Sequence, residues 1–288
     1  MRFKARLFQD MLLVVEGVIM CLEKATAGAT PTVLLHLSPG GAKLALPTAS
    51  TEEPQVFAEL AADKLFAEYR IESQSDDCIL LEAGLANLAR AFRSGRAAPL
   101  CLLKLTKRRG QPCLCLETRA LEVDVTHDIP VKVLKAAEIE AYAPPEVPAP
   151  SVQLELPASR QLRTVVDRLK PFDRYVSLDG DMHGSLTLRA QSGEASIKTF
   201  FPNLSPRFDG FDDEAAAANN VATVRVDGRK LANVLAFYGV PCEAAIACFV
   251  EGVSFVLHVF LAPAGVGTVT YYLPVGVEEG EWMNGPEG

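Results

Sequence analysis

The sequence predicts an α+β fold that is built from two similar halves. Two segments carry this prediction: "DDCILLEAGLANLARAFRSG", which begins at Asp76, and "NNVATVRVDGRKLANVLAFYGV", which begins at Asn219. Each has an extended apolar strip, an acidic residue and a glycine, and then Leu-Ala-Asn followed by apolar residues at helical spacing. The segments lie in opposite halves of the chain, so we expect one strand-to-helix architecture to be used more than once.

Composition limits the class of protein. The chain has 288 residues, of which 49% are hydrophobic, and this is enough for one large domain or two medium ones. Its net charge of −8, taken as a whole, argues against a nucleic-acid-binding protein. The seven cysteines include no CxxC pair and predict reduced core thiols of an intracellular protein. The four histidines stand alone, so no metal and no cofactor is expected.

The N-terminus imitates a secretory signal but favours a different structure. A basic "MRFKAR" precedes the apolar "MLLVVEGVIMCL", as in a signal peptide. Asp10 and Glu16 interrupt the apolar run, however, and the first residues alternate between apolar and basic side chains, as in a half-buried strand. We therefore expect a strand and then a helix here. No run is long enough to span a membrane.

The remaining elements follow the same order in both halves. In the first half we expect strand 2–8, helix 10–25, strands 31–37, 42–47, 54–60, 65–72 and 78–83, helix 84–95, and strands 99–106, 112–120 and 122–131. In the second half we expect strand 151–156, helix 158–170, strands 173–179, 184–190, 195–201 and 221–226, helix 228–238, and strands 243–250, 253–261 and 267–274. Each half thus predicts a domain with two helices packed on antiparallel β-sheets.

A proline-rich segment separates the halves. The prolines of "KAAEIEAYAPPEVPAP" prevent a continuing helix and favour an extended linker. We therefore expect an N-terminal domain at 1–134, a connector at 135–150, a C-terminal domain at 151–275 and a flexible acidic tail at 276–288.

Three of the predicted helices carry arginine on the side opposite their apolar stripe. In helix 84–95, the apolar stripe ends at Phe92 and Arg90 falls on the far side. Helices 158–170 and 228–238 repeat this arrangement with Arg160 and Arg229. Further basic residues lie on the flanks of these helices: Arg93, Arg163 and Lys230. Local positive surface attracts a phosphate backbone, whatever the net charge, so we expect these faces to bind DNA.

Two observations keep a simpler interpretation open. A basic helix face is ordinarily just solvated, and Arg163 has the i, i+4 spacing of an ion pair with Asp167. Helix 10–25 also departs from the pattern, because its far side carries Leu13, Glu16 and Met20.

A family resemblance appears in several short motifs. The doubled strand–helix–strands unit, the proline-rich connector and the closing "YYLPV" resemble a sliding clamp related to proliferating cell nuclear antigen (PCNA). Within that superfamily, "MRFKARL", "VTHDIPVKVL" at 125–134 and "VRVDGRKLANVLAF" at 224–237 resemble the Hus-one subunit of the nine-one-one DNA-damage checkpoint clamp. The similarity covers residues 1–275. It is weakest at "FFPNLSPRFDGFDDEAAAANN" and in the tail.

The resemblance implies a ring that encircles DNA and performs no chemistry. Such clamps place helices around a central hole and make phosphate contacts without base contacts, so that they can slide. It also implies a nuclear location, double-stranded DNA as ligand, a clamp loader, repair enzymes, and two other clamp subunits, Rad-nine-like and Rad-one-like, as partners. No membrane partner is implied.

The resemblance further implies a subunit interface and a peptide pocket. The strands "QPCLCLETR" at 111–119 and "EASIKTFF" at 194–201 match strands that pair between clamp subunits, which would place Leu114, Leu116, Ile197 and Thr199 at interfaces. In such clamps, client enzymes bind a shallow pocket beside the connector. The candidates for this pocket are Ile129, Val131, Ile139, Tyr142, Pro274 and Val275. Burial in the core is the alternative for Ile129 and Val131.

Two other functions stay open at this point. A homotrimeric replication clamp shares the same fold, and an intracellular enzyme with an unrecognised site is the third candidate. The chain has no GxxxxGK[ST], HExxH or GxSxG motif. His127, which has no metal-binding neighbour in the sequence, is interpreted as a structural residue that forms a hydrogen bond at a strand end.

Overall fold

The chain forms two compact units. The computed structural model describes residues 1–26, 31–46, 50–96, 98–119, 123–135, 138, 143–157, 160–193, 195–211 and 217–276. The first unit comprises Met1–Glu146, Asn233–Ile246 and Leu257–Tyr272. The second comprises Val147–Ala232, Ala247–Val256 and Leu273–Gly288. The chain passes to the second unit within the predicted connector, but two later segments return to the first.

The first unit contains most of the helical and strand residues of the N-terminal half. Its elements are β1 (Arg2–Leu7), α1 (Met11–Ala25), β2 (Thr32–Ser38), β3 (Gly41–Ala45), β4 (Gln55–Ala61), α2 (Ala62–Leu65), β5 (Phe66–Glu72), β6 (Ile79–Gly84), α3 (Leu85–Ser94), β7 (Leu100–Arg108), β8 (Gln111–Arg119) and β9 (Asp124–Val133). Most of β18 (Gly267–Pro274) and the 3₁₀ helix η3 (Leu235–Gly239) also belong to it. The strand order is β18-β4-β3-β2-β6-β9-β8-β7-β1-β5, with antiparallel pairing.

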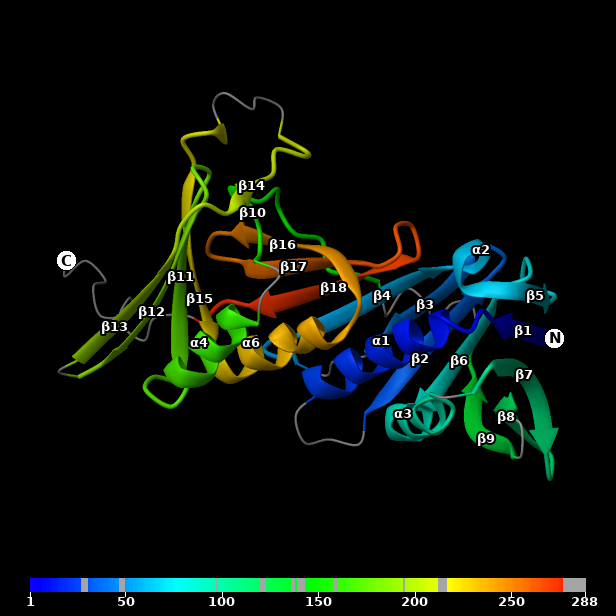
Figure 1. Ribbon diagram of the computed structural model, residues 1–288. Helices are drawn as coiled ribbons and strands as arrows, with labels where there is room; N and C mark the ends of the chain where they lie inside the picture. The colour runs from blue at the N-terminus through cyan, green and yellow to red at the C-terminus, as the bar shows by residue number, and fades with distance from the viewer. Residues whose placement is uncertain are drawn as a thin grey trace, which may run out of the picture. The chain divides into compact units, whose positions relative to one another are not determined.

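The core of the first unit lies between its helices and its strands. α1 and α3 lie side by side (Figure 1). Their apolar faces meet the buried residues of β1, β2, β3, β4, β7 and β8, where the side chains of Val15, Ile19, Leu88 and Phe92 are buried or nearly so. In β1, Phe3, Ala5 and Leu7 are buried, whereas the residues between them are exposed or half-buried. The predicted alternation of β1 is therefore confirmed.

The described residues of the second unit include a separate four-stranded sheet, the helices α4 and α6, and strands of the larger sheet. Its elements are β10 (Val152–Glu155), α4 (Gln161–Leu169), β11 (Tyr175–Asp181), β12 (Ser185–Ser192), β13 (Ala195–Phe201), β14 (Ser205–Pro206), β15 (Val221–Asp227) and most of α6 (Gly228–Val234). β16 (Cys242–Val250) and β17 (Ser254–Leu261) contribute to both units. The order in the four-stranded sheet is β13-β12-β11-β15 (Figure 1). The fold class is therefore α+β, as predicted.

Several element boundaries differ from the sequence-based expectation. The predicted helix 228–238 is an α-helix only to Val234 and continues as the 3₁₀ helix η3. A single helical turn, α2, separates β4 from β5 and was not predicted. Arg160 precedes the first residue of α4, so it lies at the helix N-terminus and not on the helical face that the pattern predicted.

Two glycines allow neighbouring strands to approach β4 closely. A Cβ atom at Gly41 would lie 2.0 Å from the carbonyl oxygen of Leu60, and one at Gly267 would lie 2.0 Å from that of Glu59. Both glycines have positive φ angles, 152° and 156°. No side chain fits at either position, so β3 and β18 pack tightly on the two sides of β4.

Candidate nucleic-acid and partner interfaces

In the first unit, the predicted DNA-binding residues lie on the exposed side of α3. Leu85, Leu88 and Phe92 are buried, which leaves Arg90 and Arg93 exposed, as the helical pattern predicted. Arg93 forms an ion pair with Glu23 of α1 at 3.3 Å, and both side chains are largely exposed. Arg90 has no ion pair among the described residues. Arg90 is thus the stronger candidate for a phosphate contact, because the charge of Arg93 is shared with Glu23.

The unusual far side of α1 has a structural explanation. Glu16 is buried, with 4% of its side chain exposed, and its carboxylate lies 3.3 Å from the Nε of Arg96. Leu13 is 43% exposed. The sequence pattern counted Glu16 as a surface residue, but it lies beside α3 and the turn that follows it, so its charge is compensated by Arg96.

In the second unit, the C-terminal end of α4 lies against the N-terminal end of α6. A Cβ atom at Gly228 would lie 3.2 Å from the Cβ of Lys170, which places the start of α6 against the end of α4. Asp227 accepts hydrogen bonds from the backbone N–H groups of Arg229 (2.9 Å) and Lys230 (3.2 Å), and so caps the first turn of α6. Arg229 is exposed and Lys230 is half-buried.

The residues of α4 carry a weaker basic surface than the sequence suggested. Arg163 forms an i, i+4 ion pair with Asp167 at 3.7 Å. This agrees with the simpler interpretation, in which Arg163 belongs to an ordinary solvated helix face. Lys170 also contacts Asp167, at 2.5 Å. Arg160 is exposed at the start of the helix. Asp167 thus offsets the charge of Arg163 and Lys170, whereas Arg160, Arg168 and Arg229 are exposed in this unit.

The predicted interface strand of the second unit lies at a sheet edge. Among the described strands, β13 pairs with β12 alone, from Leu186↔Phe201 to Ser192↔Ala195. Its residues are exposed on both faces or half-buried, including Ile197 (39% exposed) and Thr199. An edge of this kind presents unpaired backbone N–H and C=O groups.

The prediction that residues 111–119 form an interface strand of the first unit is wrong. β8 pairs with β7 on one side and with β9 on the other along almost its whole length, so it has no free edge. Leu114 and Leu116 are buried, with 5% and 0% of their surfaces exposed. The family resemblance implied an edge strand, but four consecutive residues of β8, at 113–116, are buried, as is typical of an internal strand.

β9 has the open edge that β8 lacks. Its residues 124–130 pair with β8, and β6 pairs only with Val131, Lys132 and Val133, near the end of the strand. No other described strand pairs with this side of residues 124–130. Nε2 of His127, in this open part, lies 2.5 Å from Oγ of Ser94 at the end of α3. His127 therefore forms a hydrogen bond as predicted, but it lies within β9 and not at a strand end.

The predicted peptide-pocket residues divide into three groups. Ile129 and Val131 are only 3% and 5% exposed, so they belong to the core and cannot form an accessible pocket. Ile139 and Tyr142 lie outside the described residues. Pro274 and Val275 are half-buried, at and just beyond the end of β18.

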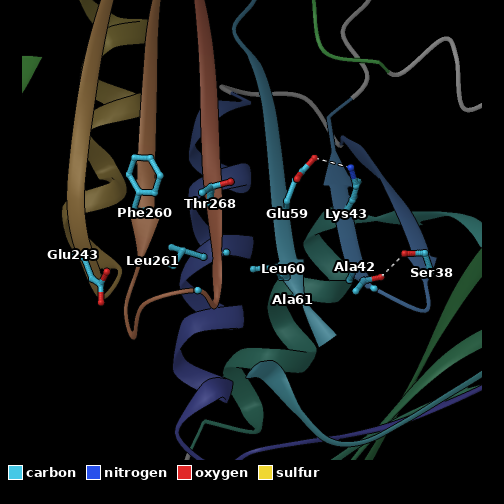
Figure 2. Close-up of a pocket in the computed structure, with 14 residues that line it drawn as sticks. Ser38, Ala42, Lys43, Glu59, Leu60, Ala61, Glu243, Phe260, Leu261 and Thr268 are labelled. Carbon is cyan, nitrogen blue, oxygen red and sulfur yellow. Dashed lines mark hydrogen bonds and ion pairs between the residues drawn. The ribbon is translucent and has the colours of Figure 1, made fainter. Parts of the chain in front are cut away.

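A shallow hollow opens on the sheet face of the first unit that lies away from the helices. It has a volume of about 500 Å³ and lies where the turns β2–β3 and β17–β18 flank the end of β4 (Figure 2). Across it, Thr268 pairs with Glu59 and Glu59 with Lys43 in register, and the Nζ of Lys43 lies 2.8 Å from Oε1 of Glu59. Phe260, which is 39% exposed, forms its far side. The hollow thus offers an aromatic surface beside a neutralised ion pair.

An apolar patch adjoins this hollow on the same face. Phe57 packs on the buried cluster of Leu34, Ala45, Leu80 and Leu134. Its ring also meets that of Tyr272 edge to face, with centroids 5.9 Å apart. Val133, at the end of β9, is 39% exposed beside Leu134. Half-buried and exposed apolar side chains therefore lie on β4, β9 and β18, whereas the sequence analysis expected some of them in the connector.

Two histidines on this face have lowered pKa values. Burial lowers the pKa of His258, whose Nδ1 lies 3.0 Å from Oγ1 of Thr270. Burial, and then the positive charge of Lys43, lower the pKa of His36. Both imidazoles are accordingly neutral at physiological pH, and the face gains no positive charge from them.

The described residues contain no group of three or more His, Cys, Asp or Glu side chains placed to hold a metal ion. Among the same residues, no helix has the length and apolar character needed to cross a bilayer.

The Glu16–Arg96 contact generates a stability prediction. We expect Arg96→Ala to lower the free energy of unfolding by about 2 kcal/mol, because it leaves a buried carboxylate without its partner. Arg93→Ala is the matched control and is expected to cost at most about 1 kcal/mol, because its ion pair with Glu23 is exposed. Urea unfolding of the two variants measures the difference. Equal losses would show that Glu16 does not depend on Arg96.

Comparison with known proteins identifies relatives along the whole described chain. A family model described as Hus1-like protein matches residues 1–277. The chain is 30% identical to the checkpoint protein hus1 of Schizosaccharomyces pombe over 241 residues, which cover 78% of this chain and 84% of that protein. It is 27% identical to the hus1 homolog of Dictyostelium discoideum over 281 residues, which cover 96% and 98%. It is 29% identical to human HUS1 over 190 residues, which cover 63% and 68%.

These matches decide between the two clamps that the sequence analysis left open. The relatives are checkpoint proteins, and their similarity extends over both units. The α+β fold, with α1 and α3 in the first unit and α4 and α6 in the second, agrees with that of a PCNA-like clamp. The matches favour the checkpoint clamp over the replication clamp. The chain belongs to the Hus1-like family of checkpoint clamp subunits.

Proposed function

We propose that this chain is a non-catalytic subunit of a heterotrimeric ring that encircles double-stranded DNA in the nucleus and recruits checkpoint and repair proteins. Its partners in the ring are one Rad-nine-like and one Rad-one-like subunit, and a clamp loader closes the ring on DNA. The observation that carries the proposal is the exposed arginine on helices of both units, in a chain whose net charge is −8. Contacts of this kind neutralise phosphates without reading bases.

The ring is assembled through strand edges. β13 presents one open edge, and residues 124–130 of β9 present another. A subunit with two different open edges can join a different neighbour at each, as a heterotrimer requires. This replaces β8 with β9 as the interface strand of the first unit.

Client enzymes bind the outward face of the first unit. Phe57 and Val133 supply half-buried or exposed apolar surface beside Leu134, just before the connector, and Phe260 lies at the adjoining hollow. Small interfaces depend on a few such anchors. We assign the peptide-binding role to this face, with Val133 at its edge.

The DNA contact predicts a change in salt dependence. We expect the triple variant Arg90→Glu, Arg160→Glu and Arg229→Glu to lose retention of the purified complex on duplex DNA, because three phosphate contacts become repulsive. The slope of log affinity against log salt should fall in magnitude by about three. Lys107→Glu is the control: this exposed cation lies at the β7–β8 turn and should leave the slope unchanged. An unchanged slope in the triple variant would contradict DNA binding by these helices.

The edge of β13 predicts two different outcomes for neighbouring prolines. Consecutive residues of a strand direct their N–H groups to opposite sides. One of Ile197→Pro and Lys198→Pro should therefore block assembly without lowering the unfolding midpoint, and the other should break the pairing with β12 and lower it. Co-purification with the partner subunits and thermal unfolding measure the two effects. Normal assembly of both variants would exclude β13 as an interface.

The peptide face predicts a loss of client binding. We expect Val133→Glu to weaken binding of a client-enzyme peptide by about 1–2 kcal/mol, because a charge replaces an exposed apolar contact. Val253→Glu is the control, since Val253 is 46% exposed in the turn between β16 and β17. Isothermal titration with a peptide from a co-purifying repair enzyme measures both affinities. Equal affinities of the two variants would refute the assignment.

A further inference from the structure

The pairing of β5, β1 and β7 places three cations side by side. Lys4 of β1 lies directly opposite Arg70 of β5 and directly opposite Lys104 of β7. The neighbours of Lys4 along β1, Phe3 and Ala5, are buried against the core, so Lys4 lies on the face of the sheet that is turned away from the helices. We call Arg70, Lys4 and Lys104 the cationic row.

The cationic row departs from the rest of the same sheet. Elsewhere cations stand opposite carboxylates: the side chains of Arg2 and Glu72 form an ion pair at 3.7 Å, as do those of Arg6 and Glu68. Lys43 and Glu59 follow the same rule at 2.8 Å. Like charges directly opposite each other on a sheet are destabilising. The row therefore lowers the stability of the unit, and the packing of the unit does not explain why three cations lie together.

The charge of the row is only partly compensated. Lys104 forms an ion pair with Glu117, whose hydrogen bond raises the pKa of Lys104. Arg70 is exposed and has no ion pair among the described residues. Lys4 reaches Glu68 only at 3.9 Å, and this same carboxylate also serves Arg6.

Arg6 adds to this excess. Its Nε atom is buried and has no hydrogen-bond partner among the described residues. Lys4 and Arg6 thus share the carboxylate of Glu68, and Arg70 has no ion pair among the described residues, so this part of an acidic protein is locally positive.

We propose that the cationic row binds a carboxylate-rich peptide of a partner protein. Adjacent strands lie about 4.8 Å apart, so the row extends over about 10 Å, and an extended peptide covers that distance with three residues. In such a peptide, side chains at alternate positions point to the same face, so two Asp or Glu residues placed two positions apart can reach Arg70 and Lys4 together. The bound carboxylates relieve the repulsion between these two cations, which is the physical reason for the arrangement.

A peptide fits this face better than a duplex. Carboxylates of Glu68, Glu72 and Glu117 lie among the cations, and a continuous phosphate backbone would meet them with like charge. A peptide can place neutral residues over these carboxylates and its acidic residues over the row. The arginines proposed to contact DNA lie instead on α3, at the start of α4 and on α6, so peptide binding by the cationic row does not depend on them.

The test uses the full-length chain and a fluorescently labelled oligoglutamate peptide, with binding measured by anisotropy at low salt. We expect the double variant Lys4→Gln, Arg70→Gln to weaken binding about tenfold, because two exposed charge contacts are lost. Lys43→Gln is the matched control, since the charge of Lys43 is already neutralised by Glu59 on the same sheet face, and it should leave binding unchanged. The same double variant should keep or raise the thermal unfolding midpoint, because it removes a repulsion.

Three results would overturn the proposal. Unchanged peptide binding by the double variant would exclude the row as the site, and an equal loss in Lys43→Gln would show non-specific attraction. A lowered unfolding midpoint would show that Lys4 and Arg70 are structural. The Arg90→Glu variant separates this proposal from DNA binding: it should weaken retention on duplex DNA and keep peptide affinity, whereas the double variant should do the reverse. Loss of DNA retention alone in the double variant would assign the row to DNA instead.

Discussion

Burial of one face of the first unit's sheet beneath α1 and α3 is the constraint on which the other surfaces depend. Because side chains alternate along a strand, burial of Phe3, Ala5 and Leu7 forces the intervening basic residues of β1 to the opposite face. The same constraint turns Arg90 away from the sheet when Leu88 and Phe92 are buried. One packing requirement therefore produces two separate charged surfaces, one on the helices and one on the strands.

Charge in this protein acts locally and is largely used in pairs. Of the arginines expected to bind phosphate, Arg93 and Arg163 contact exposed or half-buried carboxylates. Exposed pairs of this kind contribute little to stability and reduce the charge that remains available to a ligand. The surfaces best able to bind a charged ligand are therefore those where cations lack a full ion pair. Arg90 lies on one such surface, and Lys4 and Arg70 lie on another.

Much of the fold could be predicted because its signals are local. The helices at Met11–Ala25 and Leu85–Ser94 and the alternating strand β1 agree with the periodicity of the sequence within one or two residues. The change from α6 to a 3₁₀ helix was not predictable in this way, because apolar spacing in so short a segment fits both. The burial of Glu16 was also hidden, since its partner Arg96 is distant in sequence.

The sequence by itself determined the order of elements, the family motifs and the basic faces of the helices, because these depend on residues within one or two turns of each other. Only the tertiary structure decided which strand has a free edge and which residues lie opposite each other. β8 is covered by β7 and β9 on its two sides, whereas β6 pairs only with residues 131–133 of β9 and leaves the edge at 124–130 open. Likewise, Arg70, Lys4 and Lys104 come from three distant segments, and strand register alone places their charges side by side.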